Sequence, residues 1–98
     1  MHSDMDLRLL GSGSGHGGCP AVYVCDDTGE LVVQGDITDR DGTVLVPHVL
    51  LDWLEPGMKL PVEAIDAPGA FLVSGEPVTP GVRAKLTLAD NETAVVVG

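Results

Sequence analysis

Hydrophobic residues along this chain come in short runs, separated by glycine, proline and acidic residues. The runs at 21–25 and 30–34 flank the turn residues Asp-Asp-Thr-Gly, and this arrangement predicts a β-hairpin. Residues 43–46 are continuously β-branched or apolar, which is typical of a central strand buried on both faces. Residues 93–97 have the same character. The pattern therefore predicts short strands joined by tight turns.

Two stretches resemble each other forty positions apart, at residues 31–38 and 71–79. Each passes from hydrophobic residues to a small polar one, then to a glycine, an acidic residue and β-branched residues, and the second carries one extra proline. The similarity predicts two related β units packed together, with the two stretches in equivalent, pseudo-symmetric places. The expected fold class is mainly β, a small sandwich or barrel of short strands.

One short helix is expected, over residues 47–54. Pro47 suits a first helical turn because its missing N–H would have no partner there, and Pro56 and Gly57 end the helix. Apolar residues crowd most of its circumference, so one side packs on the core while another is covered or faces a partner. For Trp53 two interpretations stay open, a core residue capping the sheet and an interface hot spot. The residues predicted to bind a partner are Leu50, Leu51, Trp53 and Leu54.

Weaker signals complete the second half of the chain. Residues 58–65 alternate between apolar and polar, and Pro61 marks them as an edge strand because proline donates no ladder hydrogen bond. A single helical turn is expected around residues 82–86.

A boundary is expected near the N-terminus. Residues 5–10 alternate as an edge strand does, although a disordered tail is an equal reading, and the glycine-rich residues 11–18 predict a mobile segment. With 98 residues there is room for one core. The expected organisation is a flexible segment over 1–18 and a single β-rich domain over 19–98.

The charge is strongly negative. Fifteen acidic residues against five basic ones give a net charge of −10, which repels nucleic acid unless the cations cluster. They are scattered along the sequence, at Arg8, Arg40, Lys59, Arg83 and Lys85. Two interpretations of the acidity remain, solubility alone and attraction of a basic protein partner.

No motif for catalysis, a cofactor or a metal emerges. His16, Cys19 and Cys25 lack a fourth ligand and the short cysteine spacing of structural zinc sites. We expect both cysteines to be free thiols. No apolar run reaches the ~20 residues that cross a bilayer, and no secretion signal is recognised, so a cytoplasmic location is expected.

Over residues 18–54 the chain resembles the short acidic actinobacterial proteins of the BldB kind. The resemblance rests on Ser14, Gly18, Cys19, Leu31, Val32, Val33, residues 39–46 and the helix with Trp53. Proteins of this kind are often encoded beside helix-turn-helix regulators. The resemblance implies a regulatory, non-catalytic protein that binds a partner, such as a helix-turn-helix regulator.

A second resemblance is to the swapped-hairpin fold of AbrB-type regulators and MazE-type antitoxins. There a strand ends in a proline that begins a short helix, and a glycine turn leads to another strand. The matching residues here are 44–47, Leu50, Leu54, Pro56, Gly57, Leu60, Val62 and Ile65. This resemblance implies DNA binding as the alternative function, although only Arg40 lies near the basic positions of that motif. Exposed strand edges also favour a homodimer.

Overall fold

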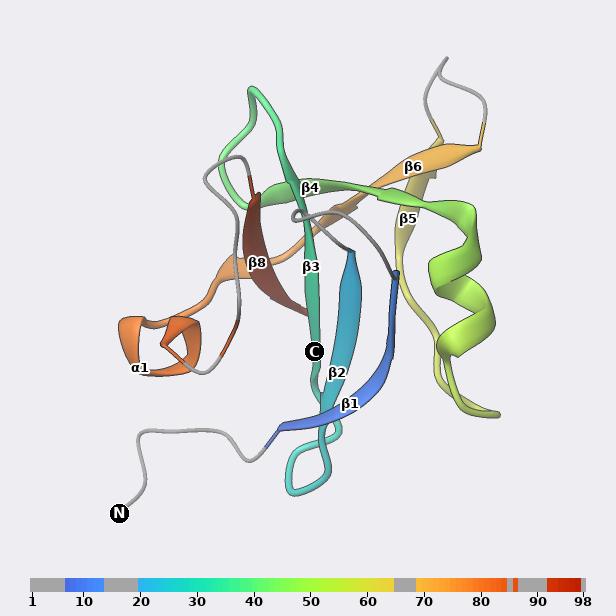
Figure 1. The fold of residues 1–98 in the computed structure, drawn as a ribbon, viewed down its shortest axis with the longest axis vertical. Coiled ribbons are helices and arrows are strands. Elements are labelled where there is room, and N and C mark those ends of the chain that lie inside the picture. Colours follow the sequence, from blue (N-terminus) through green and yellow to red (C-terminus); the bar gives the residue numbers. More distant parts are fainter. Residues whose placement is uncertain (1–6, 14–19, 65–68, 85, 87–91, 98) are drawn as a thin grey trace.

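The computed structural model describes residues 7–13, 20–64, 69–84, 86 and 92–97, which form eight strands and two short helices (Figure 1). In chain order the elements are β1 (Leu7–Ser12), β2 (Ala21–Cys25), β3 (Leu31–Ile37), β4 (Thr43–Pro47), the 3₁₀ helix η1 (His48–Trp53), β5 (Val62–Ala64), β6 (Ala70–Ser74), β7 (Glu76–Pro77), α1 (Pro80–Arg83) and β8 (Glu92–Val97). The protein is mainly β, as the sequence pattern predicts.

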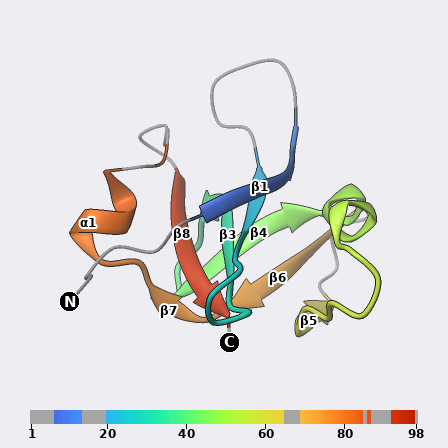
Figure 2. The same cartoon turned by 90° about the horizontal axis from the view of Figure 1, so that it is seen from below.

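The strands pair in a circuit that closes on itself. β3 pairs with β4 and β4 with β6, and β6 continues past Gly75 into β7. β7 pairs with β8, which pairs back with β3, and every pairing is antiparallel. Figure 2 shows this ring with β7 and β8 on one side and β4 and β6 on the other. Of the two architectures expected, sandwich and barrel, the closed circuit is a small barrel, with β1 and β2 extending from β3 and β5 from β6.

The barrel consists of two three-strand units with the same register. In the first unit, β2–β3–β4, Val33 pairs with Val22; in the second, β5–β6/β7–β8, Val73 pairs with Val62, forty positions later in both strands. Each middle strand also pairs with the third strand of the other unit, Val33 with Val95 and Val73 with Val44. The two units are therefore related by a pseudo-two-fold axis.

A close backbone approach recurs at the same position in both units. A Cβ built on Gly35 would lie 2.6 Å from the carbonyl oxygen of Leu45, and one built on Gly75 would collide with the carbonyl oxygen of Val96. Leu45 and Val96 are themselves equivalent, because Leu72 pairs with one and Val32 with the other. The glycine that ends the hydrophobic run in each repeat is thus required by the close approach of the middle and third strands of its own unit.

The turns before the two middle strands match as well. Gly29 and Gly69 both adopt left-handed backbone, with φ of 78° and 79°, a conformation that favours glycine. The equivalence of the two similar stretches, predicted from sequence, is confirmed by these pairings. The third strands are offset by 51 positions (Val44 to Val95), because the second unit carries α1 in the connection to β8.

The core fills the ring between the two units. It draws alternate residues from the paired strands, because successive side chains of a strand point to opposite faces. Its buried residues are Val22, Val33, Val44, Val46, Leu50, Phe71, Val73 and Val95, with Leu10, Trp53, Leu54, Leu60 and Val97 packed against them. Figures 1 and 2 show η1, the lime helix, and α1 on opposite sides of this core.

The N-terminal expectation requires a correction. Leu7–Ser12 forms β1, paired with β2 through a register shift between Leu9 and Gly11, so these residues belong to the folded domain and the disordered-tail reading is wrong for them. The side chain of Leu10 also packs against the core, so β1 is held by an apolar contact as well as by its hydrogen bonds to β2. Residues 14–19 lie outside the described residues, and their mobility stays a prediction.

The helices lie close to their predicted places. The expected helix over 47–54 is confirmed in position as η1, a tighter 3₁₀ helix that begins after Pro47 and ends at Trp53. α1 begins at Pro80, before the expected residue 82, because Thr79 caps it: its hydroxyl accepts a 3.4 Å hydrogen bond from the Val82 amide.

Candidate interaction surface

The four residues predicted to bind a partner occupy different environments. Leu50 is fully buried in the core, so it is a structural residue and contributes no surface. Trp53 and Leu54 are partly buried and pack against that core. Leu51 is 40% exposed, and Val49 on the same helix is 46% exposed. The outer side of η1 therefore presents Val49 and Leu51, and its inner side anchors the helix.

The position of Trp53 is set by β1. Its ring lies over the backbone of Gly11, where any side chain would collide with the indole. Trp53 thus packs between η1 and β1 and against the core, as the interpretation of a core residue predicts. The sequence pattern does not reveal this role of Gly11, because Gly11 begins the glycine-rich residues 11–18, for which the pattern predicts a mobile segment.

Arg8 joins three segments that are distant in sequence. Its Nε and Nη2 donate to the two carboxylate oxygens of Asp26, both at 3.0 Å. Its Nη1 and Nη2 donate to those of Glu55, at 2.9 and 3.0 Å. Such two-pronged contacts fix geometry more firmly than single ones do. Arg8 therefore ties β1 to the β2–β3 turn and to the loop after η1.

The shared guanidinium also changes acidity. Hydrogen bonds from Arg8 lower the pKa of Asp26 and of Glu55, and the same bonds raise the pKa of Arg8. All three groups are exposed, so screening by solvent keeps each pair weak in free energy. The contacts of Arg8 therefore fix the positions of the two loops but add little to the free energy of unfolding. Its partners lie 18 and 47 residues from Arg8, and no local sequence signal links them.

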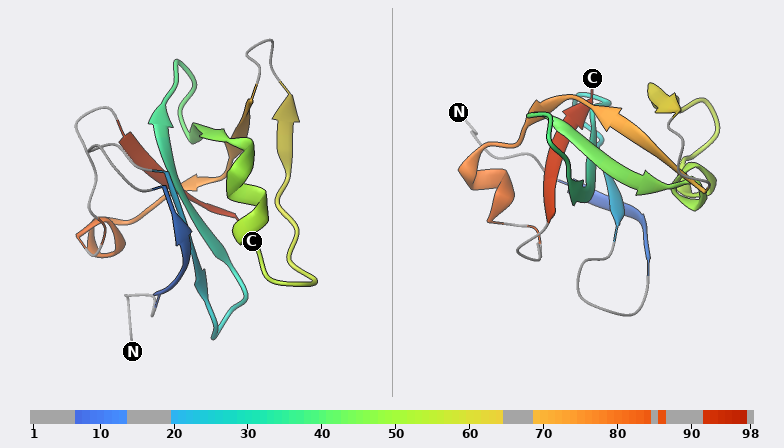
Figure 3. Two further views of the ribbon diagram at one scale, coloured as in Figure 1. Left: turned by 45° about the vertical axis from the view of Figure 1, so that its right-hand side comes forward. Right: turned by 90° about the horizontal axis from the view of Figure 1, so that it is seen from above.

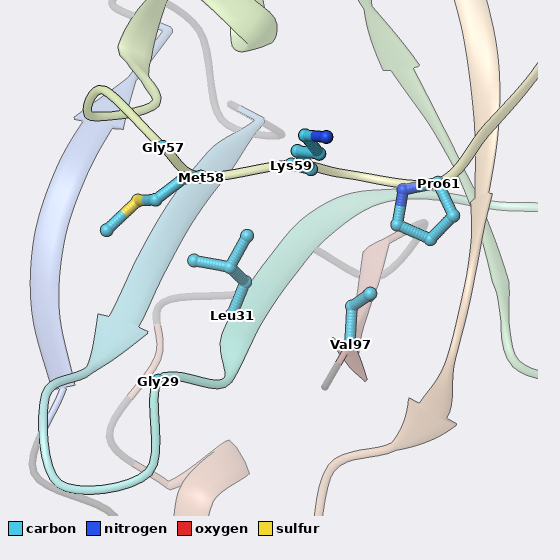
Figure 4. A pocket seen from close by; sticks show the side chains of 7 residues that line it. All are labelled: Gly29, Leu31, Gly57, Met58, Lys59, Pro61 and Val97. Atoms are coloured by element: carbon cyan, nitrogen blue, oxygen red, sulfur yellow. The ribbon is translucent and has the colours of Figure 1, made fainter.

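A cavity of about 260 Å³ lies between the two loops that Arg8 ties together. Figure 4 shows Leu31 pointing toward the loop with Met58, and Val97 facing Pro61. Lys59 supplies a cation beside these apolar groups. The complete lining is Gly29, Leu31, Gly57, Met58, Lys59, Pro61 and Val97. The volume falls below the roughly 300–1,000 Å³ typical of small-molecule sites, so the cavity suits a single side chain better than a cofactor.

A second ion pair lies at β5, the strand at the other end of the strand order from β1. One nitrogen of Arg40, Nη2, contacts both carboxylate oxygens of Glu63 on β5 at 3.3 Å. Both side chains are about half exposed. Thus two of the scattered arginines, Arg8 and Arg40, are engaged by carboxylates of their own chain, which leaves the acidic excess unbalanced.

Inside the barrel wall lies a polar cluster. Gln34 Nε2 donates a 3.3 Å hydrogen bond to Glu92 Oε1, and both side chains are almost fully buried. Burial, and secondarily the charge of Glu92, raise the pKa of the nearby Tyr23 hydroxyl. In the other unit Ser74 is equivalent to Gln34, and its hydroxyl lies 2.9 Å from that of Thr43, whose own equivalent is Ala94. Each middle strand therefore carries a polar residue at this position, although its hydrogen-bond partner differs between the units.

The described residues contain few groups suited to chemistry. Cys25 is a free and buried thiol, whereas His16 and Cys19 lie outside them. Within the part of the chain that the structure describes, no three metal-binding side chains come together. No helix among those residues has the length and apolar character needed to traverse a bilayer.

Comparison of the chain with protein-family models, with curated proteins and with solved structures finds no match.

Proposed function

We propose that this protein is a non-catalytic regulatory module that binds a basic protein partner. The observation that carries the proposal is the uncompensated acidity: fifteen carboxylates face five basic groups, and Arg8 and Arg40 already serve carboxylates of their own chain. A surface of this kind attracts cations and steers a positively charged partner toward it.

The shape of the protein supports binding more than turnover. The cavities lined by described residues are open to solvent, and one of about 370 Å³ is lined mainly by the β3–β4 turn. The exposed apolar side chains stand on the edge strands β1 and β5, at the end of β3 and on η1, where a second chain can cover them: Leu9, Ile37, Val49, Leu51 and Val62. The resemblance to proteins of the BldB kind favours a helix-turn-helix regulator as the partner. The buried, free thiol of Cys25 supports a reducing compartment, the cytoplasm.

Affinity capture with the full chain, at low and at high salt, tests this function. We expect retained proteins to carry net positive charge and to be released as salt rises, since screening weakens contacts between exposed charges. A mobility-shift assay with duplex DNA is run in parallel. Retention of DNA with steep salt dependence would support the AbrB-like alternative and count against the proposal. A monomeric protein that retains no other protein would also count against the proposal.

A further inference from the structure

The two units of the barrel differ at their outer edges. β2 and β5 are equivalent, since Val22 and Val62 pair with the equivalent residues Val33 and Val73. β1 pairs with the outer edge of β2. Among the residues that the structure describes, no strand pairs with the outer edge of β5, which lies at the margin of the molecule in both views of Figure 3.

This difference changes the burial of equivalent residues. Val22 is fully buried, whereas Val62 is 45% exposed, although both belong to matching strands. Val22 is opposite Gly11 of β1, and Leu10 of β1 packs against the same core. The second unit therefore exposes the valine that β1 helps to cover in the first.

A shallow cavity lies beside this edge. Its volume is about 190 Å³, and its lining combines apolar groups with one carboxylate: Pro61, Val62, Glu63, Leu72 and Ser74. Pro61 also lines the cavity next to Met58 and Lys59, so the two hollows flank the start of β5. The edge thus offers a strand to pair with, a hollow for one apolar side chain and a negative charge.

We propose that the outer edge of β5 binds an extended, basic segment of the partner protein as an added antiparallel strand. The inference rests on the proposed function and specifies its binding site. The added strand takes the place that β1 holds in the first unit, covers Val62 with an apolar side chain, and sets a lysine or arginine against Glu63. Strand addition at a sheet edge is a common mode of peptide recognition.

The present partner of Glu63 is easily replaced. Arg40 donates to Glu63 through a single nitrogen, at 3.3 Å. Arg8, in contrast, donates to its two carboxylate partners through three nitrogens, at 2.9–3.0 Å. Exposed ion pairs of this kind contribute little to stability, so exchange for a partner's cation costs little. β5 spans three residues and follows Pro61, which limits indiscriminate pairing at this edge.

The probe for a test is a synthetic peptide with the residues of β1, Leu-Arg-Leu-Leu-Gly-Ser, and one added lysine at each end. Its affinity is measured by fluorescence anisotropy with the wild type, Val62→Glu and the matched control Val49→Glu. Val49 is 46% exposed and lies on η1, so both variants add the same charge to an equally exposed valine. We expect Val62→Glu to weaken binding about tenfold or more, because an apolar contact is lost, and Val49→Glu to bind as the wild type does.

Amide chemical shifts then locate the peptide. We expect the largest changes at residues 61–64, and Glu63→Lys to abolish them while Glu76→Lys, also exposed, preserves them. Equal binding by the wild type and Val62→Glu, absence of binding, or shifts confined to β1 or η1 would overturn the strand-addition inference. So would a wild type that dimerises through β5 and becomes monomeric in Val62→Glu. None of these outcomes decides whether the protein binds a basic partner elsewhere on its surface. That question is answered by the affinity capture described under the proposed function.

Discussion

The indole of Trp53 lies directly over the backbone of Gly11, and a Cβ built on Gly11 would be 2.6 Å from Cδ2 and 2.8 Å from Cβ of Trp53. These atoms are too close for even a methyl group. The contact joins β1 to η1, so a glycine within an edge strand determines how the tryptophan packs.

Substitution of Gly11 by alanine should therefore displace the indole. We expect a loss of about 1–3 kcal/mol in the free energy of unfolding, as for other overpacked sites, and a red-shifted emission from the single tryptophan. Ser12→Ala, on the same strand, serves as the control and should change neither. If Gly11→Ala is as stable as the wild type and its emission is unchanged, the contact is wrong.

The pseudo-symmetry makes a paired prediction. Gly35→Ala and Gly75→Ala should each destabilise the fold by about 1–3 kcal/mol, because both insert a methyl group against a carbonyl of a neighbouring strand. Denaturant unfolding measures the two losses, with the exposed Glu76→Ala as control. A large loss at one glycine and none at the other would contradict the equivalence of the units.

Much of this arrangement can be predicted from the order of residues. The similarity of the two glycine-ended stretches locates the middle strands, and turns such as Asp-Asp-Thr-Gly locate the hairpin, because both signals are local. The register between units is not local: Val44 and Val95 are equivalent at an offset of 51, and the longer connection through α1 obscures this in the sequence.

The candidate surface is less predictable from the sequence, because it also depends on contacts between residues that are distant along the chain. Apolar crowding identifies the helix around Trp53, yet it does not distinguish the buried Leu50 from the exposed Leu51, since a 3₁₀ helix has a different period from an α-helix. The contacts of Arg8 with Asp26 and Glu55 depend on tertiary structure alone.

Removal of the Arg8 contacts should make stability depend differently on pH. The folded-state pKa values of Asp26 and Glu55 lie below their ordinary values of 3.8 and 4.5. Their contribution is thus fully present above the ordinary values and is lost as pH falls through the lowered ones. We expect Arg8→Gln to be less stable than the wild type at pH 7, with a difference that shrinks below about pH 4.5.

Thermal unfolding of both proteins across this pH range provides the measurement. Arg83→Gln, which removes an exposed arginine that donates to Thr93 instead of a carboxylate, is the control and should give no such convergence. A difference between Arg8→Gln and the wild type that grows as the pH falls would refute the assignment.

Tyr23 provides a second titration. It is the single tyrosine, and burial, with the charge of Glu92, raises its pKa above the ordinary value of 10.0. We expect the phenolate absorbance to appear at higher pH in the folded protein than in the denatured one. Glu92→Gln should bring the folded value partway back, since burial remains. A titration of folded Tyr23 at or below pH 10.0 would contradict this environment.

The binding of a basic partner is tested most directly by capture with three immobilised proteins: the wild type, Val62→Glu and Val49→Glu. We expect the wild type and Val49→Glu to retain the same positively charged protein and Val62→Glu to retain much less of it. Retention of no positively charged protein by the wild type, with duplex DNA bound in its place, would contradict both proposals.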